Sequence, residues 1–116
     1  MKKILLALNG NDIAPRFDLA PEVLIVSFGR DGASEEAKTV VLPRPSAEML
    51  CHVASTENIN TVVCGGIEEE YLQYLGWKKI DVIHSVLGSS ETALKRLREG
   101  NLKSGDILFE KSDGPR

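Results

Sequence analysis

The chain has 116 residues, carries a formal net charge of −3, and is 42% hydrophobic and 27% charged. This size and balance predict one globular domain with a core large enough to need no disulfide or metal. The acidic balance does not suggest a nucleic-acid-binding protein, which normally presents a basic face. The first apolar run, residues 4–8, is too short for a signal peptide or a membrane span. We therefore expect a cytoplasmic protein whose two cysteines, Cys51 and Cys64, are reduced.

The first half of the chain predicts three strands. Residues 3–8 are predicted as a strand that is buried on both faces, because the lysine pair at the start leads into a continuous apolar run. Residues 22–28 form a second run rich in β-branched and aromatic side chains, and residues 36–42 form a third. The turn signal at residues 29–32 and the close spacing of these two runs favour an antiparallel hairpin.

The second half predicts helices that alternate with strands. The pattern indicates helices at residues 47–55, 67–75 and 91–99, with strands at residues 60–64 and 79–84. Consecutive β–α–β units favour parallel pairing with right-handed crossovers, whereas the leading hairpin makes the sheet mixed.

The expected architecture is therefore α/β, with a mixed sheet of about five strands and helices on its faces. Residues 1–102 are expected to form the domain, with Gly76 and Gly100 ending helices. Residues 103–116 are assigned as a C-terminal tail, and fraying is expected from residue 101 onward.

Three irregular segments follow strands and are candidates for a shared site: residues 9–21, 64–66 and 85–90. In open α/β sheets, ligands bind outside the carboxyl ends of parallel strands. If the first, fourth and fifth strands are parallel neighbours, all three segments lie on one rim. Glycines, helix N-termini and the guanidinium of Arg16 would suit an anion there.

Each candidate also has a plainer interpretation. Gly65-Gly66 could be only a tight strand-to-helix turn, Cys64 a small buried hydrophobe, and His84 a structural or exposed residue. Cys51 is expected in the core, and the carboxylates of residues 68–70 suit a solvated helix start. The sequence contains no GxSxG, HExxH, GxGxxG or P-loop motif. A Cys64–His84 nucleophile pair lacks an identifiable third group that would orient it.

Three stretches together resemble the dinitrogenase iron–molybdenum cofactor biosynthesis family. They are LNGNDIAPRFDLAPEVLI near the start, NTVVCGG in the middle, and VLGSSETALKRLREGNL near the end. The resemblance implies a ribonuclease-H-like fold with a five-stranded mixed sheet. It also implies a non-enzymatic, nitrogenase-accessory type of protein that binds an anionic iron–sulfur or molybdenum-containing cluster, with a cluster donor or acceptor protein as a possible partner.

The chain departs from this family in its opening loop. Many members have His-Phe-Gly where this chain has Arg16-Phe17-Asp18. Because arginine stays protonated, it does not ligate a metal as imidazole does. Arg16 could hold an anionic cluster by charge and hydrogen bonds, or it could pair with Asp18 and shape the loop. Phe17 is expected to fold inward and anchor the loop, leaving Arg16 to face the pocket.

Two functions follow as hypotheses. The first is a cluster carrier, and the alternative is a regulatory or protein-interaction module that kept the fold without cluster binding. A small hydrolase or nuclease has little support, because the first strand offers no carboxylates for a two-metal site. The residues expected to bind the cofactor are Asn9, Gly10, Arg16, Phe17, Gly65, Gly66, Gly88 and Ser89, with Cys64 and His84 as candidate metal ligands.

Overall fold

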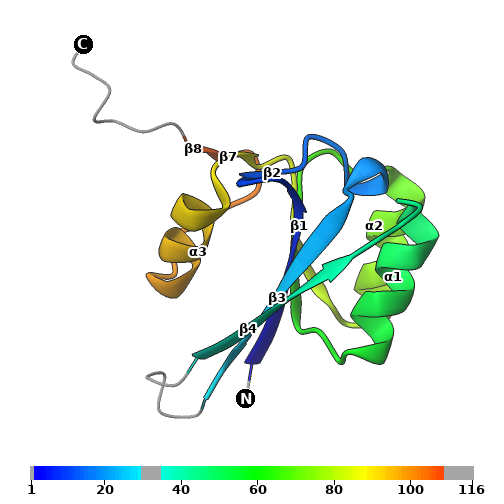
Figure 1. The fold of residues 1–116 in the computed structure, drawn as a ribbon, viewed down its shortest axis with the longest axis horizontal. Helices are drawn as coiled ribbons and strands as arrows, with labels where there is room; N and C mark the ends of the chain where they lie inside the picture. Colours follow the sequence, from blue (N-terminus) through cyan, green and yellow to red (C-terminus); the bar gives the residue numbers. More distant parts are fainter. Residues whose placement is uncertain (1, 30–34, 109–116) are drawn as a thin grey trace.

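A mixed sheet forms the centre of the computed structural model, which describes residues 2–29 and 35–108 (Figure 1). Its strand order is β4-β3-β1-β5-β6. β3 is antiparallel to both of its neighbours, whereas β5 and β6 run parallel to β1. The bounds of these strands are β1 Lys2–Asn9, β3 Glu22–Phe28, β4 Glu35–Val41, β5 Thr61–Val63 and β6 Asp81–Ile83.

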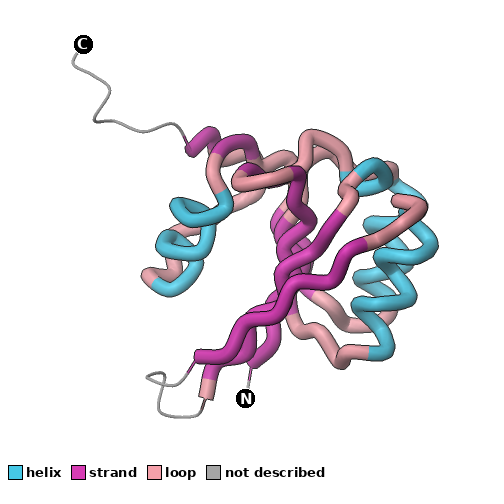
Figure 2. The backbone as a smooth tube through the Cα atoms, viewed as in Figure 1, coloured by secondary structure: helices cyan, strands magenta, loops and turns pink. Residues whose placement is uncertain are grey.

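Helices cover both faces of the sheet (Figures 1 and 2). α1 (Ala47–Thr56) and α2 (Glu69–Trp77) lie side by side on one face, and α3 (Ser90–Arg98) lies on the other. α1 begins where the sequence predicts, because the hydroxyl of Ser46 accepts a hydrogen bond from the Met49 amide at 3.0 Å. No helix within the described ranges is long and apolar enough to cross a bilayer.

β1 separates two hydrophobic cores because its side chains alternate between the two faces. Leu5 and Ala7 belong to the core beneath α1 and α2. Ile4 and Leu6 belong to the core beneath α3. The continuous apolar run at the start of the chain thus forms the central strand, buried on both sides as the sequence predicts.

The α/β class, the mixed sheet with five strands along its main path, and the helices on both faces are confirmed. The turn expected at residues 29–32 falls mostly outside the described residues. Gly76 was expected to follow α2, but it lies within the helix. The chain turns instead at Lys79, whose φ of 65° is left-handed, and β6 spans Asp81–Ile83 where the sequence predicted a strand over residues 79–84.

The sequence did not predict four short elements. They are β2 (Asp12–Ile13), the 3-10 helix η1 (Phe17–Leu19), β7 (Leu87–Gly88) and β8 (Ile107–Leu108). β8 pairs in parallel with β7, and both Leu102 and Leu108 are buried in the core beneath α3. The expectation of fraying from residue 101 is therefore wrong for residues 101–108, because these leucines cover apolar surface of the second core.

Candidate functional site at the loop rim

The rim is the edge of the sheet where β1, β5 and β6 end. Backbone hydrogen bonds join its first two loops, which are residues 9–21 and residues 64–66. The Phe17 amide donates to the Gly66 carbonyl at 2.7 Å, and the Gly66 amide donates to the Pro15 carbonyl at 2.8 Å. The opening loop and the Gly65-Gly66 turn thus form one unit. This contact supports the predicted meeting of loops that follow parallel strands.

The third loop is held in the same way. The Ser90 amide and hydroxyl both donate to the Asn11 carbonyl, at 2.8 and 3.0 Å. The Ser85 amide donates to the Gly65 carbonyl at 2.8 Å. All three segments that the sequence singled out therefore lie on one rim, as predicted.

A cavity of about 480 Å³ opens between the first and third loops. It combines polar groups at the end of β1 and at the start of α3 with an apolar wall. Its lining residues are Asn9, Asp12, Ile13, Pro15, Leu87, Gly88, Ser89 and Leu108. Asn9, Gly88 and Ser89 were predicted from the sequence, whereas the other five were not.

The glycines of the rim serve contacts between loops. A Cβ on Gly65 would lie 2.3 Å from the Ala14 carbonyl oxygen, and a Cβ on Gly88 would lie 2.6 Å from the Leu108 Cβ. Gly88 also has a φ of +124°, a backbone conformation that residues with a side chain rarely adopt. Gly65 and Gly66 do not line the cavity, nor does Gly10, whose amide donates to Glu22 at 3.2 Å. The tight-turn interpretation of Gly65-Gly66 thus accounts for their positions.

Arg16 does not face the cavity as a free cation in this structure. Its Nε and Nη2 donate to the two carboxylate oxygens of Asp18 at 3.0 and 2.9 Å. The structure thus shows the alternative in which Asp18 pairs with Arg16 and shapes the loop. Phe17 is 1% exposed and packs in the core beneath α1 and α2, so its predicted anchoring role is confirmed.

The two candidate metal ligands have different surroundings. Cys64 is fully buried, and burial raises the pKa of its thiol to about 12, so the group is protonated at neutral pH. His84 is half-buried, and its Nδ1 lies 3.0 Å from the Ser85 hydroxyl. The described part of the chain contains no group of three histidine, cysteine or carboxylate side chains that could hold a metal ion.

Groups that attract an anion and a group that repels one both lie at the cavity. α3 begins beside it, and Ser89 caps this helix by accepting a hydrogen bond from the Thr92 amide at 3.0 Å. A helix N-terminus favours a negative group, whereas the carboxylate of Asp12 opposes one. No lysine or arginine occurs among the lining residues that the structure describes. The cavity can therefore offer hydrogen-bond donors and apolar contact, but an anion there would depend on few positive groups.

A family model described as dinitrogenase iron-molybdenum cofactor matches residues 1–100. The chain belongs to this family. The match includes all three rim loops and ends before β8, so the Leu108 wall of the cavity lies beyond the matched region. No curated protein matches the sequence.

Solved structures share the fold of this family member at low sequence identity. The apo form of the orange protein from Desulfovibrio gigas is 21% identical, with a TM-score of 0.70 over 90% of this chain and 92% of that one. The MJ0327 protein of Methanocaldococcus jannaschii is 22% identical, with a TM-score of 0.68 over 87% and 91%. PH0822 is 16% identical, with a TM-score of 0.77 over 88% and 93%.

Proposed function

We propose that this protein holds an anionic iron–sulfur or molybdenum-containing cluster in the rim cavity and carries it, without catalysis, during metallocofactor biosynthesis. The observation that carries the proposal is the cavity of about 480 Å³ between the first and third rim loops in a member of this family. We also infer that the fold is ribonuclease-H-like, since a mixed sheet with five strands along its main path agrees with what the resemblance implies.

The cavity would hold its cargo through contacts other than thiolate ligation. The Asn9 side-chain amide offers donors, and Pro15, Leu87 and Leu108 offer apolar contact. The N-terminus of α3 adds a partial positive charge. Cys64 is left out of this set because its thiol is buried and protonated.

Arg16 follows Pro15, which lines the cavity, and could supply a positive charge to a bound anion if it left Asp18. Its side chain is 54% exposed and that of Asp18 is 32% exposed. An exposed ion pair of this kind contributes only about 0–1 kcal/mol. An anionic cargo could therefore draw Arg16 away from Asp18 at little cost in stability.

Anaerobic reconstitution tests the proposal. The apo-protein is incubated with iron, sulfide and tetrathiomolybdate and then desalted, and the retained metal is measured by elemental analysis. We expect retention by the unmodified protein and by Cys64→Ala. Asn9→Trp should lose the metal because the indole fills the cavity, whereas Asn101→Trp, at an exposed position outside the cavity lining, should keep it.

Charge variants test how the cargo is held. Asp12→Asn should increase retention, because it removes the carboxylate that opposes an anion in the cavity. Asp18→Asn should also increase retention, because it releases Arg16. Loss of all metal from the folded, unmodified protein on desalting would reject the carrier function, and equal retention by Asn9→Trp and the unmodified protein would reject the site.

The alternative function is a regulatory or protein-interaction module without cluster binding. The Arg16–Asp18 pair favours it, because this pair occupies the position where many family members have a histidine. A stable protein partner that is isolated with metal-free protein from native lysate would support the module. Metal that co-purifies anaerobically in the absence of any partner would count against it.

A further inference from the structure

The groove between α1 and α2 is a second feature, outside the rim cavity. Its volume is about 640 Å³. The two helices run in the same direction, and their first turns are joined where the Tyr71 hydroxyl donates to Glu48 Oε2 at 2.8 Å. The groove is lined by Glu48, Cys51, His52, Ser55 and Thr56 from α1 and by Glu70, Tyr71 and Tyr74 from α2.

Carboxylates line this groove. Among the described residues, its lining contains those of Glu48 and Glu70 and no lysine or arginine. Glu48 already accepts the Tyr71 hydrogen bond, and this bond raises the pKa of Tyr71 to about 12. Glu70 makes no hydrogen bond or ion pair to any described residue, so its carboxylate is available to an incoming cation.

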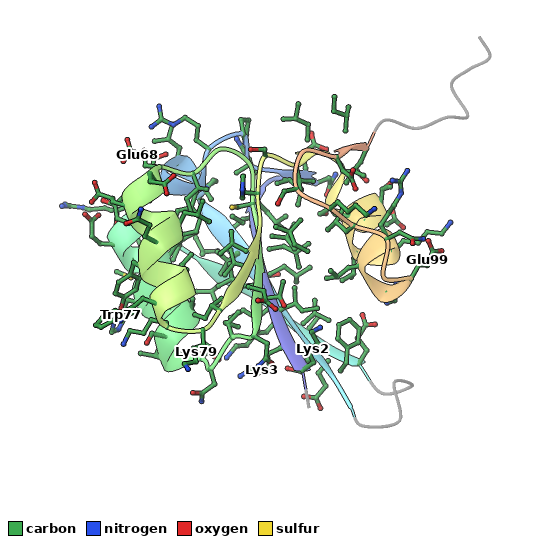
Figure 3. All side chains as sticks on the ribbon, turned by 180° about the vertical axis from the view of Figure 1, so that it is seen from behind. Lys2, Lys3, Glu68, Trp77, Lys79 and Glu99 are labelled. Carbon is green, nitrogen blue, oxygen red and sulfur yellow. The ribbon has the colours of Figure 1, made fainter. Side chains whose placement is uncertain are left out.

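Two aromatic side chains follow Glu70 on the same face of α2, of which Tyr74 lines the groove and Trp77 comes one turn later. Glu70, Tyr74 and Trp77 are spaced i, i+4 and i+7, so they lie along one face of the helix. Trp77 is 79% exposed and projects from the end of α2 opposite Glu68 (Figure 3). The Tyr74 ring already attracts a cation, because the Lys78 Nζ lies 5.7 Å from its centre. Tryptophan and tyrosine are enriched in protein interfaces, which makes an exposed tryptophan beside a groove informative.

We propose that the α1–α2 groove is the docking surface for an arginine- or lysine-bearing amphipathic helix of a partner protein. The carboxylate of Glu70 pairs with the basic head group. The Tyr71 and Tyr74 rings contact its aliphatic stem, and Trp77 covers the apolar side of the partner helix. Charge complementarity selects this occupant, since an acidic helix would be repelled by Glu48 and Glu70.

A designed peptide pair tests the proposal on metal-free, full-length protein. One amphipathic helix has leucines at i, i+3, i+4 and i+7 with flanking arginines, and the other has glutamates in place of the arginines. Affinity is measured by calorimetry near pH 8. Trp77 is the only tryptophan in the chain, so its fluorescence reports occupation of the groove. We expect the arginine peptide to bind, to change this fluorescence, and to weaken with added salt.

Matched charge variants identify the surface. Glu70 lies in the first turn of α2 and Glu91 lies in the first turn of α3, so glutamine at either position removes the same charge from the same type of helix end. We expect Glu70→Gln to weaken binding about fivefold and Glu91→Gln to leave it unchanged. Tyr74→Leu should weaken binding while keeping an apolar side chain at that position.

Four outcomes would overturn the proposal. They are equal binding of the arginine and glutamate peptides, no binding of the arginine peptide, equal effects of the two glutamine variants, and binding of free arginine amide as tight as that of the peptide. The last outcome would identify a small-cation pocket instead of a docking surface.

Discussion

Substitution of Gly65 by alanine tests whether the loop-to-loop contact holds the rim together. The new Cβ would lie 2.3 Å from the Ala14 carbonyl oxygen and 2.5 Å from the Pro15 carbonyl oxygen. Both atoms belong to the backbone, so no side chain can rotate away to make room. The opening loop must therefore move away from the Gly65-Gly66 turn.

The cost of this movement follows from what the contact contains. Overpacking at a buried site costs about 1–3 kcal/mol. The displacement also strains the hydrogen bonds from Gly66 to Pro15, at 2.8 Å, and from Phe17 to Gly66, at 2.7 Å. Each contributes about 0.5–1.5 kcal/mol. We expect Gly65→Ala to lower the free energy of unfolding by about 2–6 kcal/mol, a large part of the 5–15 kcal/mol typical of a domain.

The assay is urea unfolding followed by far-ultraviolet circular dichroism, with the midpoint and the slope compared between variants. Gly66→Ala is the matched control. Its Cβ would come no closer than 3.4 Å to any neighbour, so we expect a change below about 1 kcal/mol. A stability of Gly65→Ala within about 0.5 kcal/mol of the unmodified protein, or equal losses in both variants, would refute the reasoning.

Three further predictions concern buried and paired groups. Phe17→Ala should cost about 3–5 kcal/mol in urea unfolding, because this anchor is 1% exposed; a loss below about 1 kcal/mol would contradict its anchoring role. Cys51 and Cys64 should resist alkylation in the folded protein near pH 8, because burial raises their pKa values to about 11 and about 12, and both should react once the chain is unfolded; rapid labelling of the native protein would contradict this. Hydrogen bonding to Lys38 lowers the pKa of Glu57, so this carboxylate stabilises the fold above its unfolded pKa and loses that effect as pH falls through its folded pKa. Glu57→Gln should therefore cost under about 1 kcal/mol near pH 7 and nothing once both states are protonated, and a stability difference that persists in strong acid would argue against the pairing.

The main sheet could be predicted from the sequence because its signals are local. The apolar run at residues 4–8 indicates a strand buried on both faces, and the alternation of strands and helices after residue 46 indicates parallel pairing. The meeting of the three loops then follows from topology. β2, β7 and β8 could not be predicted, because two-residue strands depend on long-range pairing and carry no periodic pattern of their own.

The candidate site was predicted less completely for the same reason. Asn9 and Ser89 stand at the ends of regular elements, where the sequence draws attention to them. Asp12 and Leu108 line the cavity only through contacts between distant segments. The choice between a free Arg16 and an Arg16–Asp18 pair depends on side-chain geometry. The two residues are only two positions apart, so their proximity could be noted from the sequence but their bidentate pairing could not.

The region that matches the family and the residues that line the rim cavity do not coincide, because β8 lies outside the matched region. Residues 1–100 define the family and build the three loops, whereas the Leu108 wall of the cavity comes from the segment beyond them. A family member that differed only after residue 100 would keep the same scaffold and the same loops but would have a differently shaped opening. The shape and size of this cavity can therefore change during evolution without any change in the sequence pattern by which the family is identified.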